Sequence, residues 1–535
     1  MSKTFIVPVI FRGGLNLSAT LLDLTAGECR QLHNYEINTL GKYQRILGYE
    51  RFDGRPAPSD LKPSMLEGYP FPNDAAELVA LNAARTLRRN NIQPVPGSGR
   101  ILGCFVFGAS VYAFRNTAAG SAAKLWRSSL GGWTEVSTPA LLPGGRYETL
   151  RCNFSGSAGG IEVVGCDGVN PAWRFNGAGF TQITTSITPN APRHLQALPS
   201  QVLLLAFAGG SLLYSAIGDP TKWSPVDGGG EIAVADEIVG MTIEPDNSCA
   251  VFCRNRTYVL YGKSKADFNL TTLSMTTGAI EWSIQSVAGA IYMDDRGLTR
   301  LNRVQAFGNF DAATISQAIE PLLRGYVGRA VGSFVVKRKN QYRLCFEDGG
   351  GVILTFAGQD NYGFSTFSFG KTIRCVTSDE DSAGREVIFF GSDDGYLYQA
   401  EKGFSFDGQS YTDVLRPAFT DLGAQDINKR WRKIVVECET SGRTTLTMVP
   451  DFDFSSPENA ADQPKYLEVF GGGGYWDQAT WDETTWSAAS AYTADIYIDG
   501  VGRTMSLLIT STSDSNPPHI IRSMLIHAAA RGRRR

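Results

Sequence analysis

The sequence contains few charged residues for its length. Of its 535 residues, 19% are Asp, Glu, Lys or Arg, whereas charged residues make up about 25% of an average soluble protein. The 50 basic and 53 acidic residues nearly cancel, leaving a net charge of −3. A disordered chain would be poor in aromatic residues, but this one has 29 Phe, 20 Tyr and 9 Trp. The composition therefore excludes disorder, and the small net charge indicates no bulk attraction to nucleic acid or acidic membranes.

Metal-binding residue types are equally scarce. The four His are isolated from one another, and although Cys29 and His33 have the spacing of one helix face, two ligands do not make a zinc site. The nine Cys are irregularly spaced and form no C-x-x-C pair, and most lie in apolar runs, where Cys behaves as a small buried hydrophobe. The sequence thus predicts no metal and no cofactor, and it favours synthesis in a reducing compartment without a disulfide framework.

Targeting signals and catalytic motifs are also missing. The N-terminus lacks the apolar core of a signal peptide, and the most apolar stretch, 195–214, is interrupted by Pro199 and Gly209-Gly210. No nucleophile elbow, Walker loop or dinucleotide-binding glycine motif occurs, nor does the S-x-D-x-G-x-T-W turn that propeller sialidases repeat. We therefore predict neither membrane insertion nor enzymatic activity.

A repeated hairpin pattern fills the middle of the chain. Each unit has a run of apolar β-formers, a turn rich in Gly, Asp or Asn, and a second run containing aromatics. The seven units lie at 101–114, 161–175, 202–214, 250–261, 290–301, 334–346 and 387–398. Their mean spacing is about 48 residues, between the periods of WD40 and kelch repeats.

This repeat predicts an all-β fold built on a propeller. A hairpin alone cannot bury its apolar face, but blades repeated around an axis bury one another's faces. The alternative is a pair of β-sandwiches, and we favour the propeller because the internal pattern of each unit recurs. The number of blades stays open, between six and eight.

The remaining segments predict three parts. Residues 1–100 form an N-terminal arm with one short helix, which we expect to be an interface region. The helix is indicated by a capping box at Asp74–Glu77 followed by leucines at helical spacing and an Asn-Asn stop. Residues 101–405 form the propeller, and residues 406–535 form a C-terminal β domain of ordinary domain size.

Two features of the C-terminal part are candidate contact sites. Trp476, Trp481 and Trp486 recur every five residues, a spacing that suits neither a helix face nor a strand face. These rings either close the domain structurally or anchor a protein interface, where Trp is enriched. The chain ends in a basic run that is either a solvated tail or an arm touching a neighbour or DNA phosphates; its arginines are Arg531, Arg533, Arg534 and Arg535.

Three stretches resemble one family of proteins. Gly14-Leu-Asn-Leu, Asn34-Tyr35 and 45–54 are similar to the opening of phage tail structural proteins, and 213–223, which includes Asp219 and Trp223, is similar to a turn of the same proteins. The Trp-Asp repeat at 476–486, the closing β segment and the short basic tail are similar to their C-termini. Together these stretches resemble the tail nozzle (tail tubular, or packaged-DNA stabilisation) proteins of short-tailed phages.

The resemblance implies a structural virion protein that is made in the host cytoplasm and is not an enzyme. It implies a homo-oligomeric ring, a hexamer, at the distal end of the tail below the adaptor ring of the portal assembly. Such a ring encloses the DNA exit channel, retains packaged DNA, contacts it non-specifically during ejection, and carries fibres or spikes and a distal plug. Asp219, Trp223 and the three C-terminal Trp are the partner-binding candidates. The alternatives are a propeller that binds or cleaves polysaccharide, or a hub or adaptor elsewhere in the tail.

Overall fold

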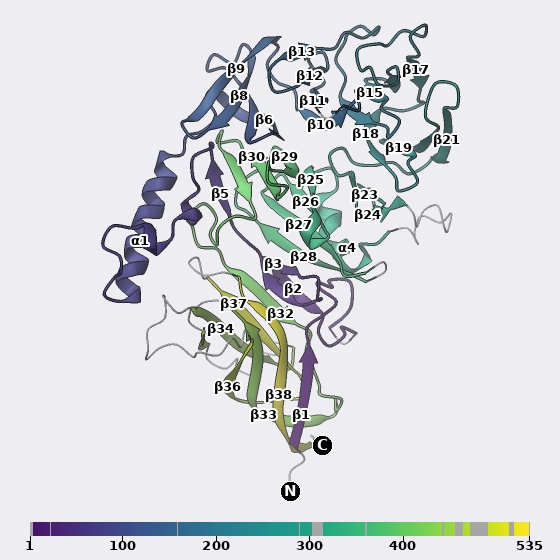
Figure 1. The fold of residues 1–535 in the computed structure, drawn as a ribbon. Coiled ribbons are helices and arrows are strands. Elements are labelled where there is room, and N and C mark those ends of the chain that lie inside the picture. Colours follow the sequence, from purple (N-terminus) through teal and green to yellow (C-terminus); the bar gives the residue numbers. More distant parts are fainter. Residues whose placement is uncertain are drawn as a thin grey trace.

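The computed structural model describes residues 4–21, 23–157, 159–287, 289–301, 314–358, 361–440, 443–454, 464–470, 491–512 and 518–533. Within them, short strands dominate, and one long helix, α1 (Asp74–Asn91), lies at the side of the molecule. Figure 1 shows a broad region of small sheets and, beyond it, a narrower body of long strands in which both termini lie. The predicted all-β class is confirmed.

The small sheets are the blades of a propeller. Four of them contain four strands that are consecutive in the sequence: β6 (Ser98–Phe107) to β9 (Gly132–Leu141), β10 (Glu148–Asn153) to β13 (Phe180–Gln182), β14 (His194–Ala197) to β17 (Gly230–Ala233), and β18 (Ile238–Ile243) to β21 (Asn269–Ser274). The fifth blade has three described strands, β22 (Gln285–Ser286), β23 (Ala290–Asp294) and β24 (Gly297–Arg300). The sixth runs from β25 (Ala330–Val336) to β28 (Tyr362–Ser368).

The seventh blade closes the ring. Its strands β29 (Cys375–Glu380), β30 (Glu386–Gly391) and β31 (Leu397–Ala400) are completed by β5 (Tyr49–Phe52), which comes from the N-terminal segment and pairs antiparallel with β31. The innermost strands contact one another in order from β6 through β10, β14, β18, β22 and β25 to β29, and β29 contacts β6. The described chain therefore forms a closed ring of seven blades, within the predicted range.

Each predicted hairpin occurs once per blade. Between β23 and β24, the Asp294 carboxylate accepts hydrogen bonds from the backbone N–H groups of Arg296 (2.8 Å) and Gly297 (3.0 Å). Gly297 has a φ of +141°, which a residue with a side chain rarely adopts. The hairpin joins the first two strands in blades one and six but the second and third strands in the others. This shift explains why the sequence period is loose.

The blades are held together by apolar clusters between neighbouring sheets. Buried side chains of blades one and two form an aromatic cluster in which the rings of Phe114 and Tyr147 stack at 3.7 Å between centroids. Comparable clusters lie between the further pairs of neighbours, including blades seven and one, and blades five and six meet in a larger cluster shared with the second β region. Burying one large apolar side chain contributes about 1.5–3 kcal/mol, so these contacts stabilise the ring.

The body of long strands is a sandwich of two sheets. In one sheet β1 (Thr4–Ile10) and β4 (Tyr43–Arg45) both pair with β38 (Ile520–Arg533), which is followed by β33 (Ile427–Glu439) and β36 (Ala491–Gly502), while β3 (Tyr35–Ile37) pairs with β4. The other sheet continues blade six through β2 (Cys29–His33) to β32 (Asp413–Pro417), β37 (Met505–Ser511), β34 (Arg443–Phe452) and β35 (Lys465–Phe470). One apolar cluster, with Trp431 at 0% exposure, includes residues of both sheets and of blades five and six.

Strands from the N-terminal 52 residues therefore belong to both parts of the molecule. β1 to β4 lie in the sandwich sheets, and β5 lies in the propeller. The boundaries predicted at residues 100 and 405, and the role of residues 1–100 as an interface region, stay predictions.

The helix predicted from residue 74 is present but differs in detail from the expectation. The N-cap of α1 is Asn73, whose side-chain oxygen accepts a hydrogen bond from the backbone N–H of Ala76 at 2.9 Å, so the helix begins one residue earlier than a capping box on Asp74 requires. The helix also includes both Asn90 and Asn91. Further helical turns are η1 (Pro58–Asp60), η2 (Pro63–Met65), η3 (Gln317–Ile319), α4 (Glu320–Leu323), η4 (Arg324–Tyr326) and η5 (Lys337–Lys339).

Candidate functional site

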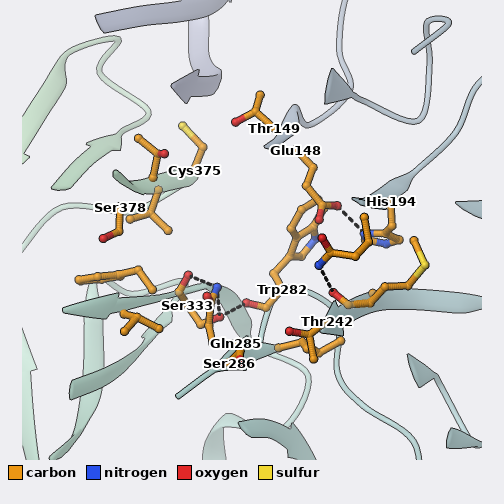
Figure 2. Close-up of a pocket in the computed structure, with 18 of the residues that line it drawn as sticks. Glu148, Thr149, His194, Thr242, Trp282, Gln285, Ser286, Ser333, Cys375 and Ser378 are labelled. Atoms are coloured by element: carbon orange, nitrogen blue, oxygen red, sulfur yellow. Dashed lines mark hydrogen bonds and ion pairs between the residues drawn. The ribbon is translucent and has the colours of Figure 1, made fainter. Parts of the chain in front are cut away.

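The innermost strands enclose a cavity of about 430 Å³ on the axis of the propeller. All seven blades contribute to its wall, and Figure 2 labels residues from blades two to seven. In blade order, its lining includes Cys104, Glu148, His194, Thr242, Gln285, Ser333 and Cys375. Most of these side chains are polar, so the cavity differs from the apolar spaces between blades and is the candidate functional site.

His194 bridges two carboxylates at this site. Its Nδ1 lies 2.8 Å from Oε2 of Glu148, and its Nε2 lies 3.2 Å from Oε1 of Glu281. Burial opposes a charge on the imidazole, but the hydrogen bonds and charges of the two glutamates raise the pKa of His194 to about 9. Burial acts to raise the pKa of Glu281, but its contact with His194 lowers that pKa below its ordinary value. The three residues therefore form a charged bridge at neutral pH.

A second cation, Arg146, lies flat on an aromatic ring. Its guanidinium carbon is 3.7 Å from the centroid of the Trp282 ring, a geometry that favours cation–π attraction. Within the described part of the chain, the guanidinium makes no hydrogen bond or ion pair. Burial lowers the pKa of Arg146 to about 10, so the group remains charged at neutral pH. Trp282 has a φ of +67°, a left-handed conformation that is uncommon for a residue with a side chain.

Neutral polar groups complete the wall. The side-chain amide of Gln285 donates to the backbone oxygen of Ser333 at 3.0 Å, and the Ser333 hydroxyl donates to the backbone oxygen of Trp282 at 2.7 Å. Figure 2 shows Gln285, Ser286 and Ser333 grouped on one side of the cavity, and Glu148 and His194 on another. These bonds hold blades five and six together beside the turn that positions Trp282.

Two cysteines lie at the junction of the first and last blades. Cys104 lies in β6 and Cys375 is the first residue of β29, and both line the cavity. The Cys104 thiol donates to the backbone oxygen of Phe389 at 3.8 Å, and both cysteines belong to the apolar cluster between blades seven and one. All nine cysteines, which the structure describes, are free thiols.

The partner-binding candidates from the sequence lie elsewhere. Asp219 accepts hydrogen bonds from the hydroxyl of Thr221 at 2.6 Å and from its backbone N–H at 3.0 Å, in an exposed turn between β16 (Ser211–Tyr214) and β17. Trp223 is 5% exposed and packs in the apolar cluster between blades two and three. Its ring therefore contributes to blade packing, and a contact of Asp219 with a partner stays a prediction.

The C-terminal candidates are partly outside the described residues. Trp476, Trp481 and Trp486 lie outside them, as do Arg534 and Arg535. Arg531 is exposed, and its backbone and that of Arg533 belong to β38. The backbone of Arg533 pairs with Ile427 of β33, so the described part of the basic run is in a sheet. Whether these arginines contact a neighbour or DNA stays a prediction.

Sequence reasoning missed the axial cavity. Four of its residues, Glu148, His194, Gln285 and Cys375, each begin an innermost strand. The sequence did carry a signal, namely a polar residue at the start of the strand that precedes a hairpin. This signal could not be interpreted, because the sequence does not say that these strand ends meet on one axis.

Comparisons with known proteins add little beyond the fold. No family model and no curated protein matches the chain. Among solved structures, it is similar to virginiamycin B lyase from Staphylococcus aureus (10% identity, 56% of this chain and 94% of that one, TM-score 0.38). It is also similar to YCF48 bound to a D1 peptide (12%, 58% and 95%, TM-score 0.36) and to the Pan2 WD40 domain of Neurospora crassa (7%, 58% and 91%, TM-score 0.37). At these values, no functional argument rests on the similarities.

No group of three or more His, Cys, Asp and Glu side chains in the described part of the chain is arranged to hold a metal ion. None of its helices combines the length and the hydropathy that a bilayer span requires.

Proposed function

We propose that this chain is a ring-forming structural subunit of a short phage tail, acting as the nozzle at its distal end. In this role, copies of the chain enclose the DNA exit channel, retain packaged DNA and let it pass during ejection. The proposal starts from the resemblance of 14–17, 45–54, 213–223 and 476–486 to tail nozzle proteins. A propeller with a second β domain is compatible with it.

The observation that carries the proposal is the outer face of α1. Val79, Ala83 and Leu87 are spaced by four residues and lie on one side of the helix. Val79 is 70% exposed and Leu87 is 67% exposed, whereas Leu81 on another side is buried. Figure 1 shows α1 at the edge of the molecule, outside the propeller. An amphipathic surface helix normally turns its apolar stripe toward its own core.

A neighbouring subunit is the partner that this face suits in the proposed ring. In a closed ring, each copy presents the same helix to the next copy, so one apolar stripe per chain is buried at every interface. The scarcity of charge in the sequence agrees with this role, because interface cores are depleted in charged residues. The near-neutral net charge agrees with a channel that does not hold passing DNA phosphates tightly.

The test is the mass of the particle that the chain forms. We expect a ring of several subunits, alone or after addition of portal–adaptor complexes, by mass photometry and electron microscopy. Replacing Val79 and Leu87 with Glu should shift the particles to monomers while changing unfolding free energy by less than about 0.5 kcal/mol, as is usual for surface positions.

Val226→Glu is the matched control, because Val226 is 95% exposed between β16 and β17 of blade three, on the opposite side of the propeller from α1 in Figure 1. This variant should assemble normally. A wild-type chain that stays monomeric even with portal–adaptor complexes would contradict the proposal. Assembly that survives the paired Glu substitutions would instead exclude α1 as the contact.

A second candidate function, glycan binding, is favoured by the axial cavity. Its hydroxyl and carboxamide groups, including those of Thr242, Gln285 and Ser333, suit the hydroxyl groups of a sugar. A glycan array would support this function if the wild-type chain bound a saccharide and Gln285→Ala lost it. A depolymerisation assay would tell cleavage from binding.

A further inference from the structure

Two cations in the wall of the axial cavity, His194 and Arg146, are compensated to different degrees. His194 contacts Glu148 at 2.8 Å and Glu281 at 3.2 Å. The guanidinium of Arg146 forms no ion pair or hydrogen bond with the described residues, and it lies 3.7 Å from the centroid of the Trp282 ring. A cation that is partly removed from water is costly without an anion beside it. This guanidinium is therefore the group of the cavity that most favours an anionic ligand.

Stacking on Trp282 positions the guanidinium and leaves its N–H groups free. The donors of an Arg side chain lie in the plane of the guanidinium, so a ring that covers its face does not occupy them. Trp282 is itself fixed: its ring centroid lies 5.3 Å from that of His194, and its backbone oxygen accepts a hydrogen bond from the Ser333 hydroxyl at 2.7 Å. Because a guanidinium can bind a carboxylate through two parallel hydrogen bonds, the cavity holds a preorganised site for one carboxylate.

Further polar groups of the wall are available to a ligand. The hydroxyl of Ser378 is buried and has no hydrogen-bond partner among the described residues, an arrangement that costs stability unless a partner is supplied. The side-chain nitrogen of Gln285 donates to Ser333, which leaves its side-chain oxygen as an acceptor. Figure 2 shows Ser378 and His194 on opposite sides of the cavity. A ligand that contacts these groups needs hydroxyl groups on several of its sides, as a sugar has.

We propose that the axial cavity binds an acidic sugar, a hexuronate, with its carboxylate on Arg146 and its hydroxyl groups on the polar wall. The proposal rests on the second candidate function, glycan binding, and specifies the class of sugar. The cavity volume of about 430 Å³ lies within the range of about 300–1,000 Å³ that is typical of small-molecule sites. Glu148 and Lys337, which line the cavity, are 29% and 64% exposed, so it is open to solvent.

The charges around the cavity favour a ligand with a single negative charge. Burial lowers the pKa of Arg146 to about 10; the charge of Arg100 acts in the same direction, and Glu281 and Glu148 oppose it. The guanidinium therefore stays charged at neutral pH and matches one carboxylate. A phosphate dianion would place two negative charges in a cavity whose wall already contains the carboxylate of Glu148, and like charges repel.

The first experiment compares ligands on the unmodified full-length chain. The methyl glycosides of glucuronic and galacturonic acid are each titrated beside the uncharged methyl ester of the same sugar, and binding is followed by ligand-observed NMR. We expect one acid to bind at least about tenfold more tightly than its ester, because hydrogen bonds between charged groups are the stronger ones. Added salt should reduce this preference.

The outcomes of this titration separate the two proposals. Equal binding of an acid and its ester would overturn the acidic class and leave glycan binding intact. Binding of none of the four sugars would overturn both. Inorganic phosphate that binds more tightly than the acids would show a general anion site and would also overturn the proposal.

Variants test the assigned anchor. Arg146→Leu should lose the preference for the acid, whereas Arg146→Lys, which keeps the charge without the paired donors, should retain part of it. Ser378→Ala should weaken the binding of acid and ester alike. Arg430→Leu is the matched control, because Arg430 lies in β33 of the sandwich, 3.2 Å from Asp499, and its loss should leave binding unchanged. If Arg146→Leu folds and keeps the full preference for the acid, Arg146 is not the anchor and the proposal is wrong.

Discussion

The axial cavity and the junction between propeller and sandwich both contain ion pairs, but their carboxylates are buried to different extents. Those at the junction are almost completely buried, whereas Glu148 and Glu281 at the cavity are 29% and 46% exposed. At the junction, Arg343 lies 3.0 Å from Glu36 and 2.7 Å from Glu401, and all three side chains are almost completely buried. In the cavity, His194 has two carboxylate partners, whereas Arg146 rests on Trp282. Each junction charge is thus paired with an opposite charge, whereas in the cavity His194 is paired and Arg146 has no carboxylate partner among the described residues.

The difference follows from what each region joins. Glu36 comes from β3, Arg343 from β26 (Gln341–Phe346) and Glu401 from the end of blade seven, so one cluster links three distant segments. A second buried pair, Arg45 and Asp413 at 2.7 Å, links β4 to β32. Charges that fix segments in place are best fully paired, because an unpaired buried charge is costly. Charges in a cavity remain available for contacts with a ligand.

The largest loss of stability is expected when the buried ion pairs at the junction between propeller and sandwich are removed. Arg343→Leu leaves the buried carboxylates of Glu36 and Glu401 with less compensation, although Lys339 still contacts both. We expect the free energy of unfolding to fall by about 3 kcal/mol, measured by urea denaturation at neutral pH. A loss below about 1 kcal/mol would show that the junction is not more tightly coupled than an ordinary surface pair.

The bridge between His194 and its two glutamates should make the free energy of unfolding depend on pH. Because the pKa of His194 is raised to about 9 from 6.5, its stabilisation is complete below about pH 6.5 and is lost as pH rises through 9. The difference corresponds to roughly 3 kcal/mol, and urea denaturation at pH 6 and pH 9.5 measures it. The stabilisation that the lowered pKa of Glu281 provides is complete above pH 4.5 and is lost only at lower pH, so it does not change within this window.

His194→Gln provides the control for this window. The variant should be less stable than the wild-type chain at pH 6. Its unfolding free energy should fall much less between pH 6 and pH 9.5 than that of the wild-type chain. An NMR titration of the wild-type imidazole supplies an independent reading. An ordinary pKa near 6.5 would refute the bridge.

The smallest effect is expected at an exposed ion pair. Arg329 lies 2.6 Å from Glu347, but both side chains are about half exposed. Arg329→Leu should change the unfolding free energy far less than Arg343→Leu does, and added salt should reduce the effect further. A loss equal to that of Arg343→Leu would remove the distinction between buried and exposed pairs.

Local features of the fold were predictable from the sequence. The seven hairpins were found at their positions because alternating apolar residues and turn chemistry act over a few residues, as at Asp294 and Gly297. Helix α1 was found for the same reason, with an error of one residue at its N-cap. The axial site was not found, because Glu148, His194 and Glu281 are separated by 46 residues or more and carry no motif.

The sequence by itself determined the all-β class, the repeated hairpin and the scarcity of surface charge, since each of these depends on composition or on short-range periodicity. Only the tertiary structure decided that there are seven blades, that β5 completes the last one, and that the inner strand ends meet around a polar cavity. The pairing of Arg51 with Tyr398 joins residues that no local pattern connects. Such long-range contacts depend on the packing of the whole ring, which also brings Cys104 and Cys375 into one buried cluster and places Arg146 on Trp282.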